Sequence, residues 1–522
     1  MTRATLMCGS ALVALGTLFL AGCSSEPPAA DTQPATSAAA DTEGTKAPAE
    51  QALLEDLTVA NRILARELDI LDVQGHVTAR SRVNPNHYYI ARFVSPGGAS
   101  IGDFIENDLD STPVDGPRTD QAREIYLHGE IYQARPDVMA VVHAHTPEFV
   151  AFGMSSVPLW NGDSQVPVWD IRPFNRGRSG IVSTPALGKA MAEKLGRSEA
   201  VLLWGHGISF TGTSLPEAIS RVDALRDSAQ LQQAAISMGV AWTPQARADR
   251  AGTSDRTWEY HKRAVLKNTE GRVPASPEPT PEKPSDPDQA TAHDLVLANR
   301  ILVSEELGIL DTLGHVSVRN PRNPNSYFIA PRVAAGAVTA GDVVQRDMTK
   351  PEADTQGLSI HDEVYKARPD VNAVLYARTP AIVAFTEGSA KLRPVVNGGA
   401  FIGNGLPVFN MSSLDPGTPI LANPALGQGV ANALGKARGV LLTGHGFVLT
   451  AGSIYNLVDQ AYALRLNAII QRQATALRGR VAFLNEQPVQ PAPTTEPAQP
   501  AATLGPPEGR AWVYWSQNVS LD

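Results

Sequence analysis

A short apolar run followed by Gly-His-Gly occurs twice in this chain, as LLWGHG at residues 202–207 and as LLTGHG at residues 441–446. Other words recur in the same order, namely ARPDV at 134–138 and 367–371, and LDVQGHV at 71–77 against LDTLGHV at 310–316. The partners lie about 233–239 residues apart, which is far too long a period for a solenoid. The sequence therefore predicts two homologous domains, at residues 51–270 and 289–522.

The two copies end in a shared motif that contains Trp and Tyr, RTWEY at residues 256–260 and RAWVY at residues 510–514. This pair is 254 residues apart, more than the earlier pairs. The extra length falls in a Pro-rich stretch, which predicts a loop insertion at residues 486–508 of the second domain. A similar stretch at residues 271–288 carries few large apolar side chains and predicts a linker.

The start of the chain carries a targeting signal. One positive charge precedes an apolar run of about 17 residues, within the range of a secretory signal and short for a bilayer span. The run ends in LAGC at residues 20–23, which resembles a bacterial lipobox. We expect a signal peptide at residues 1–22, an acylated Cys23 and a disordered tether over residues 23–50. The protein is then a lipoprotein of the bacterial cell envelope that faces the periplasm and meets the membrane only through its lipid.

Composition excludes several classes of function. Acidic residues outnumber basic ones, 53 to 44, and the formal net charge is −9, so nucleic acid is not an expected partner. The only cysteines are Cys8 and Cys23, which excludes a disulfide-stapled or cysteine-rich zinc scaffold. The hydrophobic fraction of 43% is enough for substantial cores.

Hydrophobic periodicity alternates between helix and strand within a domain. Helical patterns cover residues 51–68, 124–134, 185–195 and 215–238, and strand-like runs cover residues 87–91, 138–145 and 200–204. Strands mixed with covering helices predict an α/β layered domain.

Histidines at the ends of two predicted strands form a candidate metal site. His143 and His145 are two residues apart, and side chains at that spacing point to the same face of a strand. His206 follows the next buried strand and lies between two glycines, where the backbone can approach closely. Three imidazoles suit zinc or another divalent first-row ion and leave a coordination position open for a small-molecule substrate.

These words resemble the class II aldolase/adducin superfamily, which includes sugar-phosphate aldolases, epimerases and decarboxylases. The resemblance implies two tandem three-layer α/β/α domains of the class II aldolase type. It also implies a divalent metal on His143, His145 and His206, usually zinc, with manganese or another first-row ion as the alternative. The residue at the position of Glu124 is implied to be the acid/base that handles the proton of an enediolate.

Two short motifs of the first copy are most similar to those of an aromatic-acid decarboxylase branch of that superfamily. GHV at residues 75–77 and HGEIY at residues 128–132 carry this likeness, whereas sugar-phosphate aldolases tend to have Asn at the position of His76. We expect His76 and Arg80 either to bind a substrate carboxylate, for which an arginine offers a bidentate fork, or to be structural, because they persist as His315 and Arg319 in the second copy. His128 is expected to be structural, because it persists as His361 in the second copy.

The second copy has lost the candidate site. Tyr376 and Arg378 stand where the first copy has His143 and His145, and Gly357 stands at the position of Glu124. Only His445 remains, so we predict a non-catalytic second domain.

Three functions follow as alternatives. The first is a metal-dependent lyase that breaks a C–C bond through a metal-stabilised enolate, by decarboxylation or aldol cleavage of a small hydroxy-carbonyl compound or aromatic carboxylate. The second is a non-enzymatic, adducin-like binding lipoprotein, and the third is an epimerase. The resemblance also implies a homo-oligomer, a dimer of tandem chains, in which the second domain caps or completes the site of the first.

Overall fold

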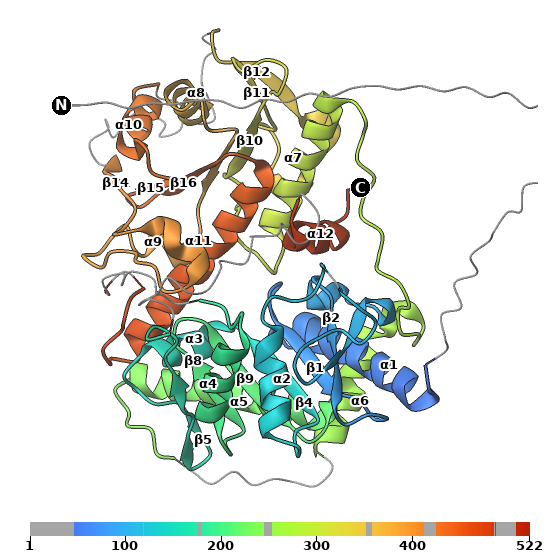
Figure 1. Cartoon of the computed structure of the whole chain (residues 1–522). Helices are drawn as coiled ribbons and strands as arrows, with labels where there is room; N and C mark the ends of the chain where they lie inside the picture. The colour runs from blue at the N-terminus through green and yellow to red at the C-terminus, as the bar shows by residue number, and fades with distance from the viewer. Residues whose placement is uncertain are drawn as a thin grey trace, which may run out of the picture. The chain divides into compact units, whose positions relative to one another are not determined.

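Two mixed sheets of seven strands each, one per copy of the repeat, organise the described part of the chain (Figure 1). The computed structural model describes residues 46–117, 119–174, 180–244, 253–350, 358–411, 424–484, 486 and 508–521. The predicted signal peptide, Cys23, nearly all of the predicted tether and residues 487–507 of the predicted insertion lie outside these ranges, as does Gly357.

In the first domain the strands lie in the order β3-β2-β1-β4-β9-β8-β7. Neighbouring strands are antiparallel except β7 and β8, which are parallel. The strands of this sheet are β1 (His76–Arg80), β2 (His87–Ala91), β3 (Phe104–Asp108), β4 (Ala140–Ala144), β7 (Val168–Trp169), β8 (Ala200–Leu203) and β9 (Gly207–Gly212). A separate hairpin is formed by β5 (Trp160–Asn161) and β6 (Ser164–Gln165).

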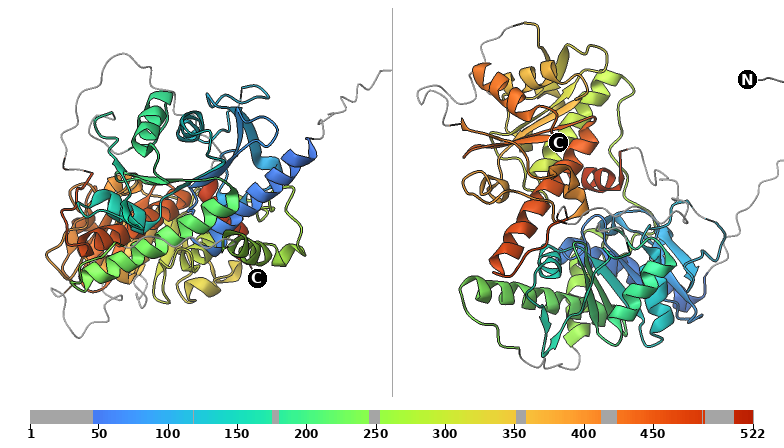
Figure 2. Two further views of the ribbon diagram at one scale, coloured as in Figure 1. Left: turned by 90° about the horizontal axis from the view of Figure 1, so that it is seen from below. Right: turned by 60° about the vertical axis from the view of Figure 1, so that its left-hand side comes forward.

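Helices cover both faces of this sheet and complete three α/β/α layers (Figures 1 and 2). Successive strand residues point to opposite faces, so Val142 of β4 lies in one apolar cluster and Val141 in the other. The first cluster includes side chains of α1 (Pro48–Arg62), the π-helical turn η1 (Ile63–Glu67), α3 (Pro147–Met154), α5 (Leu215–Ser237) and α6 (Thr253–Val265). The second includes side chains of α2 (Ile125–Ala134) and α4 (Pro185–Leu195). The predicted α/β layered fold is confirmed.

Local sequence explains where the predicted helices begin. The side-chain oxygen of Thr184 accepts a hydrogen bond from the N–H of Leu187 at 3.3 Å, directly before α4. Ser214 caps α5 in the same way through the N–H of Glu217. Each cap satisfies a backbone donor that the first helical turn leaves unpaired.

The second domain repeats this topology, with the order β12-β11-β10-β13-β16-β15-β14. Its strands are β10 (His315–Arg319), β11 (Ser326–Ile329), β12 (Val344–Asp347), β13 (Ala373–Ala377), β14 (Val408–Phe409), β15 (Gly439–Leu442) and β16 (Gly446–Ala451). Its α-helices are α7 (Pro287–Val303), α8 (Leu358–Ala367), α9 (Pro380–Val383), α10 (Pro424–Leu434), α11 (Ile454–Ala476) and α12 (Arg510–Gln517). Short 3-10 turns include η7 (Asn397–Ile402).

The two domains belong to one compact unit, residues 47–522, and share an apolar cluster. Side chains of α3 and the β8–β9 turn meet side chains of α11 and the segment before η7. The buried members are Val150, Ala151, Met154, Trp204, Val395, Ile470 and Ala474. Backbone hydrogen bonds add to this contact, and the N–H of Ser156 donates to the carbonyl of Arg480 at 3.0 Å. Domain packing therefore rests on burial of apolar surface, reinforced by an antiparallel bridge between Ser155 and Val481.

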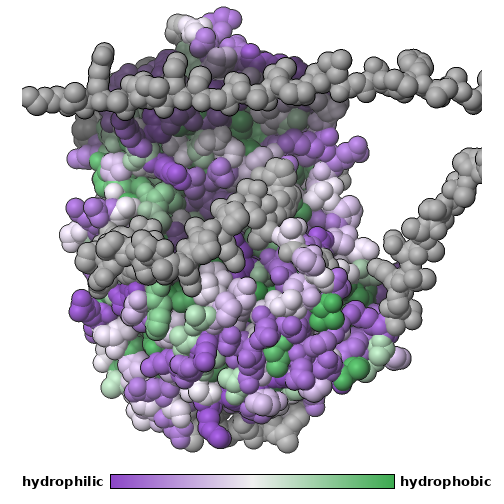
Figure 3. Space-filling model, in the orientation of Figure 1, coloured by the Kyte–Doolittle hydropathy of each residue, from purple (hydrophilic) through white to green (hydrophobic). Residues whose placement is uncertain are grey.

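On the face seen in Figure 3, hydrophobic side chains are scattered among hydrophilic ones. Exposed apolar residues such as Leu231 and Tyr260 lie on different helices, α5 and α6. Within the described ranges, no helix has the length and apolar character needed to cross a bilayer.

Candidate metal centre

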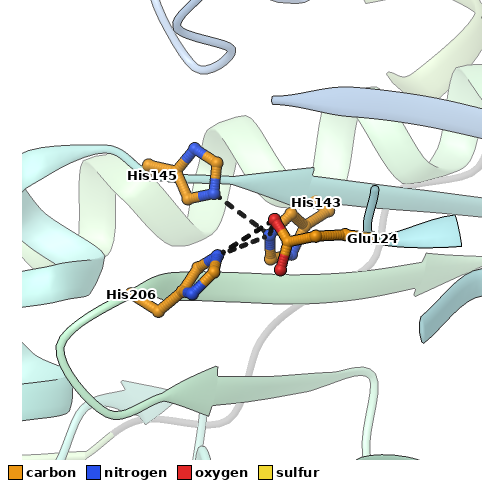
Figure 4. Close-up of side chains that lie close together, drawn as sticks. All are labelled: Glu124, His143, His145 and His206. Carbon is orange, nitrogen blue, oxygen red and sulfur yellow. Dashed lines mark hydrogen bonds and ion pairs between the residues drawn. The ribbon is translucent and has the colours of Figure 1, made fainter. Parts of the chain in front are cut away.

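Three histidines from adjacent strands of the first sheet converge on one point (Figure 4). His143 lies in β4 and His145 directly follows that strand, while His206 lies in the tight turn between β8 and β9. The Nε2 atom of His143 is 3.1 Å from Nε2 of His206 and 3.1 Å from Nε2 of His145. The predicted grouping of these three residues is therefore present in the fold.

The opposite nitrogens of the three rings are all engaged. Nδ1 of His145 donates to Oδ1 of Asp72 at 2.9 Å, and Nδ1 of His206 donates to the carbonyl of Gly180 at 2.8 Å. Nδ1 of His143 pairs with the hydroxyl of Ser209 at 3.2 Å, directly across the β4–β9 ladder. A neutral imidazole that donates through Nδ1 presents a lone pair at Nε2, so the surroundings aim nitrogen lone pairs at a common point.

Glycines allow the strands to bring these rings together. A Cβ atom on Gly207 would lie 2.1 Å from the carbonyl oxygen of Ala144 and 3.0 Å from the ring of His145. Gly205 has a φ of +62°, a conformation that L side chains rarely adopt. The Gly-His-Gly word is therefore the sequence that this turn requires.

Glu124 completes the cluster from the start of α2. Its Oε2 atom lies 3.3 Å from Nε2 of His206 and 3.5 Å from Nε2 of His143, and its Oε1 accepts a hydrogen bond from the N–H of Val182 at 2.9 Å. The candidate ligand atoms of the four residues all lie within 4.8 Å of one another. Three imidazoles and a carboxylate match the donors that a divalent first-row ion accepts.

Electrostatics in the cluster favour a bound cation. Burial raises the pKa of Glu124, but His206 and His143 outweigh it and hold the pKa well below the usual range. Burial likewise opposes ionisation of Asp72, but His145 lowers its pKa to about 2. Two ionised carboxylates therefore lie beside the three rings at neutral pH.

His76 stands behind the cluster in a chain of buried polar groups. Its ring stacks on His143 with the centroids 5.2 Å apart, and its Nδ1 is 2.8 Å from Nε2 of His128. Nδ1 of His128 in turn lies 2.9 Å from the Thr78 hydroxyl, which also meets the hydroxyl of Tyr132 at 2.9 Å. Burial lowers the pKa of both His76 and His128 well below the usual range, so these rings stay neutral. His76 therefore lies directly beside His143, one of the three candidate metal ligands.

Arg80 occupies a structural position instead of the predicted carboxylate-binding one. Its guanidinium donates to the backbone carbonyls of Val138, Pro85, Tyr132 and Arg135. Arg319 makes the same four contacts in the second domain, to the carbonyls of Val371, Pro324, Tyr365 and Arg368. A guanidinium committed to four carbonyls has little capacity left for a substrate, so these contacts oppose the expectation that Arg80 binds one.

A cavity of about 360 Å³ opens beside the cluster. Glu124, His145 and His206 form part of its wall. Residues of α11 and α12 from the second domain also line it, including Tyr462 and Trp515. Among the described lining residues there is no lysine or arginine.

The second domain lacks a comparable cluster in its described part. Tyr376 takes the register position of His143 opposite the β10 histidine, and its hydroxyl donates to the carbonyl of His445. Nε of Arg378 lies 3.9 Å from Oδ2 of Asp311, in the place where the first domain has the pair His145–Asp72. An arginine beside a single imidazole does not form a metal site.

Two features of the site escaped prediction. Asp72 lies in the repeated word at residues 71–77, and its Oδ1 also accepts from the N–H of Gly75 at 2.8 Å, a local turn contact that the D-x-x-G pattern could have indicated. The wall supplied by the second domain has no such local signal, because it depends on how the domains pack.

Comparisons with known proteins agree with the repeat. The family model "Class II Aldolase and Adducin N-terminal domain" matches residues 55–233 and again residues 293–471. A 3,4-dihydroxyphthalate decarboxylase from Arthrobacter keyseri is 30% identical over 205 residues, covering 35% of this chain and 79% of that protein. The decarboxylase tropJ from Talaromyces stipitatus is 27% identical over 194 residues, covering 33% of this chain and 73% of that protein. An aldolase II superfamily protein from Pseudomonas syringae has 22% identity and a TM-score of 0.37, covering 42% of this chain and 95% of that one.

Proposed function

The chain belongs to the class II aldolase and adducin family, in which it carries two copies of the domain, and we propose that its first domain is a divalent-metal-dependent decarboxylase. The observation that carries the proposal is the convergence of three Nε2 atoms and the Glu124 carboxylate, with the outer nitrogens held by Asp72, Gly180 and Ser209. A divalent ion held there would act as a Lewis acid and stabilise the negative charge left when a C–C bond breaks.

We assign the proton-handling role in this reaction to Glu124. Its Oε2 faces the cluster while its Oε1 is fixed by the Val182 N–H, so the carboxylate presents one oxygen to the site. After loss of carbon dioxide the substrate carbon must gain a proton, and the Glu124 carboxylate would pass on one that it has first taken from a substrate hydroxyl or from water. Asp72 and Gly180 accept from Nδ1 and so favour one tautomer of His145 and of His206, while Ser209 orients the ring of His143.

The cavity favours decarboxylation over cleavage of a sugar phosphate. A terminal phosphate needs positive counter-charges or a cluster of N–H donors. The described lining residues include no lysine or arginine, and they include the carboxyl groups of Asp72, Glu124 and Asp459. Similarity to two decarboxylases points the same way.

Metal content and carbon dioxide release test the proposal directly. The full-length chain is purified, its bound metals are measured by plasma mass spectrometry, and it is incubated with hydroxy acids and aromatic carboxylates. We expect close to one divalent ion per chain and release of carbon dioxide from at least one substrate, slowed about 10²–10⁴-fold by Glu124→Gln. A protein that neither contains nor takes up a divalent ion would instead support the adducin-like binding function.

We also propose that the protein is lipid-anchored at Cys23 in the bacterial envelope, facing the periplasm, and that two tandem chains associate. The LAGC word after the apolar run supports the anchor. Incorporation of labelled palmitate in wild type and its loss in Cys23→Ala test it. Light scattering of the detergent-solubilised chain tests the dimer, which a monomeric mass would contradict.

A further inference from the structure

The cavity beside the metal centre has walls from both domains, and the second domain contributes one charged side chain to it. Asp459 of α11 lines the cavity together with Tyr462 of the same helix and Trp515 of α12. The first-domain wall carries Glu124 and His206. A ligand that fills this space would therefore touch the degenerate domain as well as the metal centre.

The packing of α11 holds this wall in place. Ile470 and Ala474, further along the helix, are fully buried in the apolar cluster shared with the first domain. Asn467 ties α11 to the segment before η7, accepting from the N–H of Val395 at 2.8 Å and donating to the carbonyl of Arg393 at 2.7 Å. Asp459 therefore belongs to a fixed surface.

Asp459 has no hydrogen-bond or ion-pair partner among the described residues. Asp459 is an exposed residue that lines the cavity, and Val396, Ala463 and Leu466 of the same wall are apolar. Loss of surrounding water raises the pKa of the carboxyl to about 6. A carboxylate held against an apolar wall gains most from a partner that donates a hydrogen bond.

We propose that Asp459 binds a hydroxyl or amino group at the end of the substrate that points away from the metal, so that the degenerate domain determines substrate specificity. This proposal rests on the proposed function, because it takes the other end of the substrate to lie at the metal centre. The same carboxylate repels a substrate whose far end carries a phosphate or a second carboxylate.

Calorimetry with two matched ligands tests this role without turnover. Salicylate and 2,4-dihydroxybenzoate share one chelating end, and only the second carries a hydroxyl opposite it. Both are titrated into the zinc-loaded full-length chain, as wild type, Asp459→Asn and Asp459→Ala. The control is Arg472→Ala, because Arg472 is an exposed residue of the same helix and does not line the cavity.

We expect wild type to bind 2,4-dihydroxybenzoate about tenfold more tightly than salicylate, the size of one hydrogen bond to a charged group. Asp459→Ala should reduce this ratio to about twofold or less with an unchanged metal content. Asp459→Asn, which keeps the shape and one acceptor, should give an intermediate ratio, and Arg472→Ala should keep the wild-type ratio.

Equal affinities in wild type, or equal losses for both ligands in Asp459→Ala, would overturn the role of Asp459. These results are separable from failure of the proposed reaction. A chain that discriminates between the ligands but releases no carbon dioxide retains the recognition role and loses the decarboxylase function. A chain that releases carbon dioxide without discriminating does the reverse.

Discussion

Oδ1 of Asp72 accepts hydrogen bonds from Nδ1 of His145 at 2.9 Å and from the N–H of Gly75 at 2.8 Å, so one atom joins a ring of the candidate metal cluster to the turn before β1. Partners of this kind fix the tautomer of a ligating histidine and raise its basicity, and removing them typically lowers metal affinity by about 10–100-fold. We expect that loss in Asp72→Asn, measured by competition with a zinc chelator.

The second domain offers a matched control for this substitution. Asp311 makes the corresponding turn contact, to the N–H of Gly314 at 3.0 Å, but faces Arg378 instead of a histidine. Asp311→Asn should therefore leave zinc affinity at the wild-type value. Similar losses in both variants would assign the effect to the turns and not to the ring of His145.

Glu124→Gln separates proton transfer from metal binding. The amide keeps an oxygen that can accept from the Val182 N–H, and the three imidazoles remain. We expect the rate of carbon dioxide release to fall by about 10²–10⁴-fold, the usual contribution of a positioned acid or base. Metal content is measured on the same sample, and a loss of metal that parallels the loss of rate would show that Glu124 acts chiefly as a ligand.

The two Gly-His-Gly histidines should differ completely in their importance. His206→Ala removes one of three converging nitrogens and is expected to abolish stoichiometric zinc binding and carbon dioxide release. His445→Ala changes the same word in the second domain, where the described residues form no metal cluster, and should preserve both. Atomic emission and a rate assay on both variants check this, and inactivity of His445→Ala with full metal content would contradict a non-catalytic second domain.

The shared apolar cluster should contribute measurably to stability. Ile470 is fully buried between the domains, and replacing such a side chain by alanine typically costs about 2–5 kcal/mol of unfolding free energy. Leu231 of α5 is 62% exposed, and Leu231→Ala should cost less than about 0.5 kcal/mol. Urea denaturation of Ile470→Ala, followed by circular dichroism, should show either this loss or a separate early transition, and wild-type behaviour would count against a fixed domain interface.

His361 gives the second domain an acid-sensitive element. Burial holds the pKa of this histidine well below 6.5, so the folded protein keeps the ring neutral while the unfolded chain binds a proton as the pH falls below that value. Stability present above pH 6.5 is therefore lost on acidification, with a limiting slope of about 1.4 kcal/mol per pH unit. His361→Asn, which can still meet the Ser317 hydroxyl, should have a shallower acid limb in thermal melts with chelator present. An unchanged slope would contradict this role.

The parts of the fold and site that could be predicted depend on short-range pattern. The helix predicted at residues 185–195 is α4, and the buried run at residues 200–204 contains β8, because capping and apolar runs are local properties. His143 and His145 could be grouped because two-residue spacing in a strand is a geometric rule. Glu124 was reached through family resemblance, since nothing in its own neighbourhood indicates that α2 begins beside His206.

Arg80 and Asp459 show where such reasoning stops. Three of the four carbonyls that Arg80 contacts lie in the segment from Tyr132 to Val138, which the sheet brings beside β1, so these partners could not be read from the residues next to Arg80. Asp459 looks like any polar residue of an amphipathic helix until the second domain packs on the first. The surroundings of both residues are set by packing between segments that are distant in sequence, and a local sequence pattern does not indicate such packing.

The linker at residues 271–288 has a consequence for how the protein should respond to dilution. In a site shared between separate subunits, the two walls part when the protein concentration falls below the dissociation constant. Here both walls belong to one polypeptide, and a short tether keeps its partners at an effective concentration in the millimolar range. The specific activity of the proposed decarboxylase should therefore stay constant down to the lowest protein concentrations.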